Sequence, residues 1–398
     1  MTASADTNEL LFPWNDDQFR ANPYPWYERA RREAPVHQAP DGTFVVTRYD
    51  DTMQYARLPS MSIIEPETGD EDPHPWRVFG STVLWLEAPD HTRMRRLTNR
   101  WFTPKLIKQW VQVTRESING ILDELSPGQE VDAHFELGIH PTHVTMCKIL
   151  DMPIGDVEGM FWALWDAMLI NASDPVEGTL EKSRAGLQFM FDQTRERLEE
   201  KKRNPGHGLV DELLDGYNKG ELTWDEVLGT TVLLYMSGGP NPAYLIGAGF
   251  KLFAERPDIM AEFRDNPAAR GKIINELARL NPVELIITRF PTEDIEIRGV
   301  HIPAGSTVKF PIGAANRDPE TFAEPNTFDM HRPVEASRNL TFSLGTHTCA
   351  GQLISLAETE AILGAVAERY TRVELARDPI EVRTDRLIIF DKLPVVLH

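Results

Sequence analysis

Apolar residues in helical spacing dominate the middle of the chain, from about residue 89 to residue 280. Thr223 and Glu226 form the Thr-x-x-Glu pattern of a capping box, which predicts the start of a helix. The residues that follow, as far as Phe253, are apolar almost all round, so we expect this helix to run through the core. A helical stripe of apolar residues over 352–370 predicts a further long helix near the C-terminal end.

Strand-like patterns are short and lie outside this helical stretch. Residues 43–47 form one such run, and alternating apolar residues over 295–310 predict strands around a Pro-Ala-Gly turn at 303–305. Residues 311–345 are rich in turn signals. Because no internal repeat or long Gly/Ser linker divides the chain, we expect residues 1–398 to form a single, mainly α domain with small β-sheets.

The charge of the chain narrows the possible partners. Acidic residues outnumber basic ones by 61 to 41, which gives a net charge of -20. Such a surface repels nucleic acid and anionic membranes, and no apolar run approaches the roughly 18 residues of a membrane span. The first residues lack the basic segment of a signal peptide. We therefore expect a cytoplasmic protein that binds neither nucleic acid nor membrane.

The two cysteines, Cys147 and Cys349, are too few for a disulfide framework and lack the spacing of a zinc site. Cys147 lies in an apolar, helix-like stretch and is expected to pack in the core. Cys349 lies in a glycine-bearing loop just before a helix, where free N–H groups and the helix dipole favour a thiolate. This sulfur could bind a metal ion and leave the opposite side of the ion open. The alternative is an ordinary buried cysteine before a helix.

The whole segment from Phe342 to Gly351, Phe-x-x-Gly-x-His-x-Cys-x-Gly, resembles the haem-binding loop of cytochromes P450. The resemblance covers nearly the whole chain and implies the family fold, an α-helical prism with small β-sheets, and a haem b (iron protoporphyrin IX) cofactor. It implies that Cys349 is the proximal iron ligand, that Phe342 shields it and that His347 contacts a haem propionate. Gly351 lets the backbone approach a flat, bulky group. Ser343 departs from the family pattern, which usually has Gly at this position.

Three further residues match propionate-binding positions of the family. His91 and Arg95 stand four residues apart at the start of a predicted helix and so share one face. Arg289 lies on the predicted strand that follows the helix with the Glu-x-x-Arg pair at 276–279. Paired cationic or polar donors neutralise carboxylates such as the two haem propionates. For each residue alone, a solvated basic side chain is the alternative.

A Glu-x-x-Arg pair, Glu276 and Arg279, stands where the family has its structural Glu/Arg pair, which Arg332 would complete. The resemblance implies that these three residues hold the core on the cysteine side and take no part in the chemistry. The alternative is an ordinary surface ion pair, worth about 0–1 kcal/mol.

The long helix departs from the family on the oxygen side. The family usually carries Ala-Gly-x-(Asp/Glu)-Thr, whereas this chain has Gly238, Gly239, Pro240 and Asn241, with Pro240 in the acid position and Asn241 in the alcohol position. We expect the Asn241 amide to donate to bound oxygen or to hold a water. Pro240 and Pro242 should kink the helix, and the two glycines should leave room above the iron. The alternative is a purely structural kink in an impaired enzyme.

The topology of the family also indicates a substrate pocket with an apolar, aromatic-rich wall, which suits a small hydrophobic substrate such as an aromatic or a terpenoid compound. Each aromatic residue, taken alone, is more commonly a core residue. The strongest candidates for this wall are Trp85, Trp165, Leu285 and Ile287, with Trp76, Phe79, Leu84, Phe161, Trp162 and Leu169 beside them.

A basic segment contrasts with the acidic remainder of the chain, since residues 91–115 contain seven Lys or Arg and no acid. We expect Arg93, Arg96 and Arg100 to dock an acidic electron donor such as a ferredoxin or a flavodoxin-like protein. A solvated basic face is the alternative. No nucleotide-binding glycine loop is present, so electrons would come from a separate protein.

These features favour a haem-thiolate monooxygenase that inserts one oxygen atom from O2 into a small hydrophobic substrate, by hydroxylation or O-demethylation. A peroxide-driven peroxygenase is a second hypothesis, because the acid–alcohol pair is missing. Such family members usually place an Arg in the long helix, and residues 222–254 contain none. A non-catalytic haem-binding protein is the third hypothesis.

Overall fold

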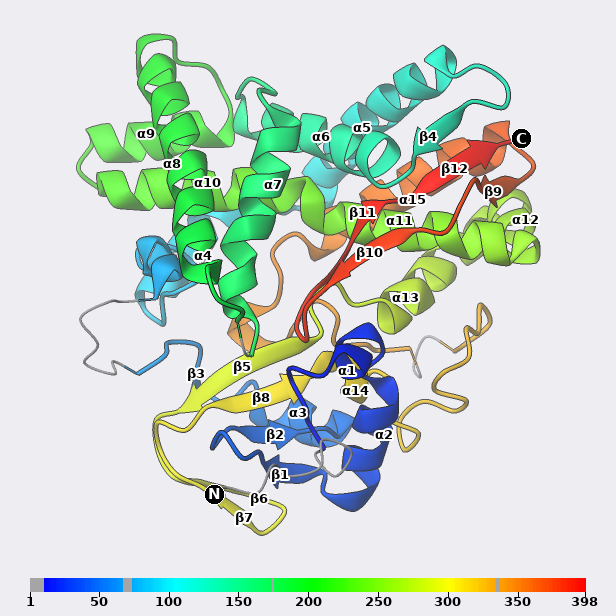
Figure 1. Cartoon of the computed structure of the whole chain (residues 1–398). Helices are drawn as coiled ribbons and strands as arrows, with labels where there is room; N and C mark the ends of the chain where they lie inside the picture. Colours follow the sequence, from blue (N-terminus) through cyan, green and yellow to red (C-terminus); the bar gives the residue numbers. More distant parts are fainter. Residues whose placement is uncertain (1–10, 67–73, 174, 334–336) are drawn as a thin grey trace.

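A large group of helices lies against a smaller region that contains most of the strands of the main sheet (Figure 1). The computed structural model describes residues 11–66, 74–173, 175–333 and 337–398. The expectation about a signal peptide falls largely on residues 1–10, which lie outside this range. The predicted class is confirmed, because the fold is mainly α with small sheets.

The helices account for most of the described chain. Their bounds are α1 (Asp17–Ala21), α2 (Tyr24–Glu33), α3 (Tyr49–Tyr55), η1 (Pro75–Phe79), α4 (Asp90–Asn99), η2 (Arg100–Phe102), α5 (Pro104–Glu124), η3 (Phe135–Ile139), α6 (His140–Leu150), α7 (Val157–Met168), η4 (Leu169–Asn171), α8 (Thr179–Arg203), α9 (Leu209–Asn218), α10 (Trp224–Gly238), α11 (Pro240–Glu255), α12 (Pro257–Asp265), η5 (Pro267–Ala269), α13 (Arg270–Leu280), α14 (Ile312–Ala315), η7 (Gly345–His347) and α15 (Gln352–Arg369). None of the helices in the described ranges combines the length and the apolar character that a membrane crossing needs.

The strands form one larger sheet and three small ones. Their bounds are β1 (Val36–Gln38), β2 (Phe44–Val46), β3 (Met61–Ser62), β4 (Glu130–Asp132), β5 (Ile286–Pro291), β6 (Ile295–Ile297), β7 (Val300–Ile302), β8 (Val308–Pro311), β9 (Val373–Leu375), β10 (Ile380–Arg383), β11 (Ile388–Lys392) and β12 (Pro394–Leu397). The larger sheet has the order β1-β2-β8-β5-β3, and only its β2–β8 pair is parallel. The other sheets are β4-β12-β9, β10-β11 and β6-β7.

The predicted strands over 295–310 are present, but the chain turns twice there. Arg298 and Gly299 join β6 to β7 in a tight hairpin, and both have positive φ, 50° and 79°. Gly305, in the predicted Pro-Ala-Gly turn, also has a positive φ of 77° and precedes β8. The pattern of apolar residues therefore located the strands and only one of the two turns.

The long central helix of the sequence pattern is two helices that meet at Gly239. The capping box starts α10 as predicted: Glu226 N donates to Thr223 Oγ1 over 3.2 Å, and Thr223 N donates to Glu226 Oε2 over 2.8 Å. The interruption matches the expected kink. Pro240 begins α11, where a missing N–H costs little because first-turn N–H groups have no intrahelical partner. The break is therefore local, and both halves remain regular.

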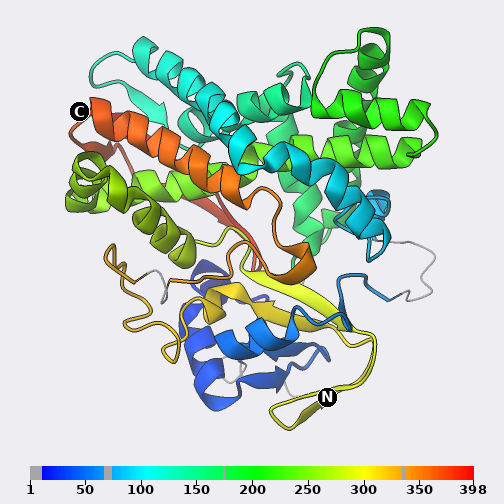
Figure 2. The same cartoon turned by 180° about the vertical axis from the view of Figure 1, so that it is seen from behind.

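The helical region has its core between α11, α13 and α15, and α15 also packs along α5. A second cluster of buried apolar side chains lies among α6, α7, α8, α9 and α10, and a third lies on the larger sheet. Seen from behind, the segment that leads into α15 lies between the helices and the sheet (Figure 2). This position places the cysteine loop at the junction of the two regions.

Glu276 lies at the centre of a buried ion network. Its carboxylate accepts hydrogen bonds from Arg279 Nε and Nη2 over 2.8 and 2.7 Å, and from Arg332 Nε over 3.1 Å. The three residues are 1%, 0% and 5% exposed, so they are not an ordinary surface pair. Burial raises the pKa of Glu276, but the hydrogen bonds and charges of Arg279 and Arg332 lower it more, and the net shift is downward.

Replacing Glu276 with Gln should destabilise the fold by about 3–5 kcal/mol, because two buried guanidinium groups would lose their counter-ion. Chemical denaturation of the purified protein measures this change. Because the folded pKa of Glu276 is depressed, its stabilisation is present above the unfolded pKa and is lost as the pH falls through the folded value. The variant should lack this part of the acid sensitivity.

Asp123→Asn is the matched control, because Asp123 pairs with Arg369 over 2.7 Å at the exposed surface. It should leave stability almost unchanged. If both substitutions lowered the free energy of unfolding equally, the buried Glu276 network would contribute no more to stability than an exposed ion pair.

Candidate functional site

The loop before α15 has a defined backbone geometry. Cys349 N donates to Phe342 O over 2.9 Å, and Ser343 N donates to Leu340 O over 2.9 Å. Ser343 and Gly345 have positive φ values of 60° and 74°. Left-handed backbone favours glycine, so the structure explains why the serine is unusual here: it adopts a conformation that glycine accepts more easily.

The sulfur of Cys349 differs from that of Cys147 in its surroundings. The Cys349 side chain is exposed, whereas Cys147 is buried and burial raises its pKa to about 12. The atoms on one side of Cys349 desolvate its thiol and raise the pKa; the N–H groups of Gly351 and Gln352 and the charge of Arg95 oppose this shift. A thiol with an open face and a raised pKa keeps its proton until a metal ion displaces it.

The predicted propionate residues meet beside this loop. The rings of His91 and His347 lie 4.2 Å apart between centroids, and Arg95 Nη2 donates to Thr348 O over 2.6 Å. Arg289 is anchored on β5 by a 3.0 Å hydrogen bond from its Nε to Ala56 O. Burial, more than the charges of Arg289 and Arg95, lowers the pKa of His347. The structure therefore brings all four residues into one cationic group, whose positive charge is carried by the two arginines.

His91 is the most deeply buried histidine of this group, at 4% exposed. Its Nε2 has no hydrogen-bond partner within the described structure. Burial, with smaller contributions from His347 and Arg95, lowers its pKa to about 4. An unpaired buried polar atom is costly, so this nitrogen is suited to a ligand that brings its own polar group.

Glu87 belongs to the same group and was missed by sequence reasoning. Its Oε1 accepts from Ser62 Oγ and Ile63 N, both over 3.1 Å, and its Oε2 lies 3.3 Å from His347 Nε2. Burial raises the pKa of Glu87, but these hydrogen bonds and the His347 charge lower it more. The partners of Glu87 are distant in sequence, so no local pattern reveals them. The one signal for Glu87 in the sequence was its position directly before the segment that contains His91.

The sulfur and the hydrogen-bond donors that these residues offer are of the kind that a haem needs. No group of three or more His, Cys, Asp or Glu side chains in the described ranges could hold a metal ion alone. A metal ion bound through Cys349 would therefore take its other ligands from a cofactor, as porphyrin nitrogens supply them to iron. His91 Nε2 and the guanidinium groups of Arg95 and Arg289 are donors of the kind that carboxylate substituents need.

The two glycines at the helix break do not leave open space. A Cβ on Gly238 would lie 2.3 Å from Met146 Cε, and one on Gly239 would lie 3.1 Å from His143 Cβ. Both glycines therefore let α6 approach the break, and our expectation that they make room above an iron is wrong. Asn241 is exposed, in contrast to residues 242–250, which are all buried.

The expected substrate wall is largely core. Leu285 is 0% exposed and packs beside Gly313, so our expectation for this residue is wrong. Trp165 and Ile287 are also buried, at 9% and 8%. Trp85 is half-buried and stacks on His74 at 6.1 Å between ring centroids. Of the four candidates, Trp85 keeps the most open position.

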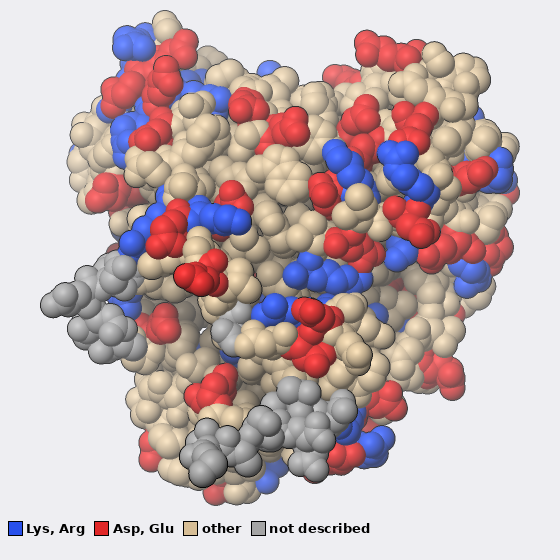
Figure 3. Space-filling model, viewed as in Figure 1, with Lys and Arg blue, Asp and Glu red and all other residues tan. Residues whose placement is uncertain are grey.

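The basic segment is partly neutralised by acidic neighbours. Arg93 pairs with Glu226, and Arg100 Nη2 lies 2.5 Å from Glu212 Oε2. Arg96 makes no ion pair with any described residue. On the face shown in Figure 3, Lys and Arg are interspersed with Asp and Glu and do not gather into one large patch. Arg96 is therefore the one of the three that is free to meet a partner.

Gly238→Ala should destabilise the fold by about 1–3 kcal/mol, because the new Cβ would overlap Met146 in a close-packed contact. The cost should be smaller in a Met146→Ala background, and thermal or chemical denaturation of the four proteins of this cycle measures the coupling.

Gly120→Ala is the matched control, because its Cβ on α5 would meet nothing within 4 Å. It should stabilise the protein slightly, as alanine does in an exposed helix. A harmless Gly238→Ala would contradict the close approach of α6.

Comparisons with known proteins agree with this geometry. The family model of Cytochrome P450 matches residues 271–393. "Biotin biosynthesis cytochrome P450" of Bacillus subtilis is 27% identical over 375 residues, which cover 90% of this chain and 92% of the relative. "Cytochrome P450 107B1" of Saccharopolyspora erythraea is 28% identical over 399 residues, 96% of each chain. The solved structure of P450BioI in complex with an acyl carrier protein ligated to hexadec-9Z-enoic acid has a TM-score of 0.87 at 25% identity, over 96% of this chain and 99% of that one.

The chain is therefore similar to bacterial cytochromes P450 in sequence and in fold over nearly its whole length, and the family model matches the part that carries the cysteine loop. This similarity marks it as a monooxygenase of the P450 type, and that family holds its haem through a thiolate and uses O2 and a redox partner.

Proposed function

We propose that residues 1–398 act as one domain that inserts an oxygen atom from O2 into a small hydrophobic substrate, with haem b held through the Cys349 thiolate. The observation that carries the proposal is the open-faced sulfur of Cys349 at the start of α15, beside the cationic group on α4, β5 and the loop. In this proposal Phe342, whose carbonyl accepts from Cys349 N, shields the sulfur on the loop side.

His91, Arg95, Arg289 and His347 hold the two propionates in this proposal. His91 offers its unpaired Nε2, and the two arginines offer positive charge. Glu87 orients the His347 ring through Nε2, because its carboxylate is itself fixed by Ser62 and Ile63. Glu276, Arg279 and Arg332 position the segment before the loop and touch no reacting atom.

The haem iron, when bound, supplies the activation of O2 with electrons from the partner. Asn241 serves the proton side of the reaction from the exposed face of α11. Its amide donates hydrogen bonds but cannot relay a proton as a hydroxyl does, so a water held by this amide carries the proton. The α10–α11 break keeps Asn241 in the first turn of α11, with Gly238 and Gly239 acting only as packing residues.

Electrons come from a separate ferredoxin or flavodoxin-like protein that docks near Arg93, Arg96 and Arg100. Arg96 contributes most, because Arg93 and Arg100 already have carboxylate partners in this chain. The substrate is an aromatic or terpenoid compound that is hydroxylated or O-demethylated, with Trp85 as the wall residue. The absence of Arg over residues 222–254 disfavours a peroxygenase that binds a fatty-acid carboxylate.

Cys349→Ala should abolish the thiolate signature of the reduced carbon monoxide complex, because the substituted loop offers no sulfur to iron. The measurement is the Soret band of the haem-reconstituted protein under CO. Cys147→Ala is the matched control, since Cys147 is buried in the helical core and should leave the band in place. A thiolate band that persists in the Cys349 variant would sink the proposal.

Asn241→Ala should raise severalfold the peroxide released per electron consumed, because the water that supplies the proton would lose its anchor. Asn241→Thr, which restores the hydroxyl that the family usually has, should keep the coupling of electrons to product. Peroxide and product are quantified against reductant consumed. Full coupling in the alanine variant would remove Asn241 from the proton path.

A further inference from the structure

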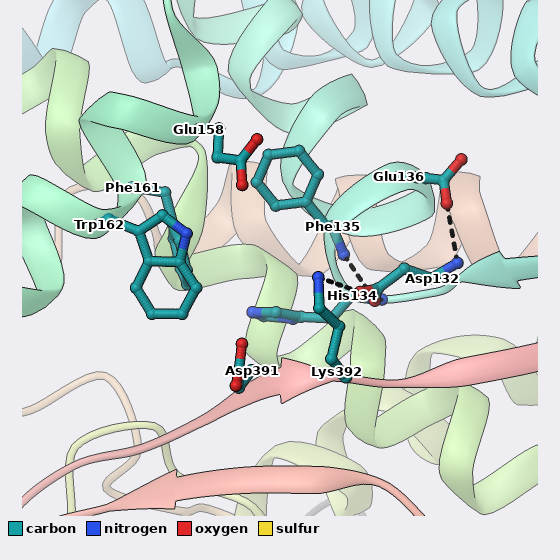
Figure 4. Close-up of a pocket in the computed structure, with 9 residues that line it drawn as sticks. All are labelled: Asp132, His134, Phe135, Glu136, Glu158, Phe161, Trp162, Asp391 and Lys392. Carbon is teal, nitrogen blue, oxygen red and sulfur yellow. Dashed lines mark hydrogen bonds and ion pairs between the residues drawn. The ribbon is translucent and has the colours of Figure 1, made fainter. Parts of the chain in front are cut away.

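A small cavity of about 130 Å³ lies where η3 and the end of β4 meet α7 and β11 (Figure 4). None of its lining residues belongs to the haem-site residues proposed above. They are Asp132, His134, Phe135, Glu136, Glu158, Phe161, Trp162, Asp391 and Lys392. The aromatic pair Phe161 and Trp162, expected from sequence to face the substrate, lines this cavity instead.

His134 presents an unpaired acceptor to the cavity. It is 1% exposed, and its Nδ1 lies 3.2 Å from Ala243 O. A carbonyl only accepts, so Nδ1 carries the proton and Nε2 is left with a lone pair. Nε2 is buried and has no partner in the part of the chain that the structure describes. Figure 4 shows this end of the ring directed toward Asp391 and Trp162.

Burial lowers the pKa of His134 to about 4, more than Ala243 O and Asp132 raise it. The ring is therefore neutral at neutral pH, and a ligand that satisfies Nε2 must be a hydrogen-bond donor. Because leaving a buried acceptor unpaired is costly, an incoming donor has a favourable place to bind.

The charge of the lining selects a cation. Four carboxylates face one ammonium group, since Lys392 is the only lysine or arginine among the nine lining residues. Lys392 Nζ lies 3.6 Å from Asp132 Oδ2, and Glu136 Oε1 accepts from Asp132 N over 3.0 Å. Glu158 and Asp391 have no ion-pair partner among the described residues. Three of the four carboxylates, Glu136, Glu158 and Asp391, therefore remain without a counter-charge among the described residues.

The lack of a metal-ligating cluster and the aromatic lining of the cavity favour an organic cation over a metal ion. The described residues contain no group of three metal-ligating side chains. The rings of Phe161 and Trp162 lie 4.9 Å apart at 70°, and Phe135 packs edge-on to Phe161 at 6.2 Å. Aromatic faces attract ammonium groups through the negative face of the ring.

We propose that this cavity binds a small primary ammonium ion, which donates to His134 Nε2, pairs with Asp391 and Glu158 and lies against the aromatic wall. The binding does not depend on the haem chemistry proposed above. Because His134 Nδ1 holds Ala243 on α11, the bound ion would also restrain the helix that carries Asn241.

Titration calorimetry of the holoenzyme with ethylammonium chloride at pH 7 and low salt tests the proposal, with ethanol as the uncharged probe. We expect saturable one-to-one binding of ethylammonium and none of ethanol. The Soret band is followed in the same titration, because an amine bound to iron would shift it. Binding that appears only together with a shifted band would overturn the proposal.

The double substitution Glu158→Gln/Asp391→Asn should weaken ethylammonium binding about tenfold or more, since a hydrogen bond to a charged group contributes about 1.5–3 kcal/mol. Glu181→Gln is the matched control, because Glu181 also lies in a first helical turn but outside the cavity. It should leave the affinity unchanged.

Affinity that survives the double substitution would place the ion elsewhere and reject the site. Tight binding of Zn²⁺ or Mg²⁺ that the same substitutions abolish, without ammonium binding, would replace the organic cation by a metal ion. Both carboxylates are partly exposed surface groups, so these variants should remain folded, and the CO-reduced spectrum checks this.

Discussion

The buried carboxylate of Glu276 is the constraint on which the cysteine loop depends. Arg279, which it fixes, donates to Asn316 O over 2.7 Å. Asn316 in turn accepts from Leu340 N over 2.8 Å and donates to Thr341 Oγ1 over 3.0 Å. The next residue along the chain is the one whose carbonyl receives the N–H of Cys349. A continuous set of hydrogen bonds therefore runs from a buried ion pair on α13 to the sulfur-bearing loop.

The site is assembled from segments that are distant in sequence, and hydrogen bonds between these segments hold it together. α4 brings His91 and Arg95, the segment before it brings Glu87, and β5 brings Arg289, all beside the loop. Among the described residues, Glu87 is the one carboxylate that hydrogen-bonds within this group, and its partner there is His347. The excess of positive charge that remains is what makes the group suitable for a dianionic cofactor.

Local signals in the sequence located the elements but not their contacts. The capping box at Thr223 and the apolar stripe over 352–370 depend on neighbouring residues only, and both helices are present. The cysteine motif is equally local. Glu87 pairs with a residue 260 positions away, and Leu285 is covered by packing that no pattern records. Gly238 shows the same limit. The sequence shows that this position has no side chain, but it does not show that α6 packs into the space.

The interruption at Gly239 allows α10 and α11 to open independently of each other. Each of the two helices completes its own hydrogen-bond ladder, one from the Thr223 cap and the other from a proline start, so neither needs the other to remain regular. The Thr142 hydroxyl, 2.9 Å from Gly239 O, ties the junction to α6. Amide protection against solvent exchange can therefore be lost on one side of the junction while it persists on the other, which divides the longest apolar stretch of the chain into two cooperative units.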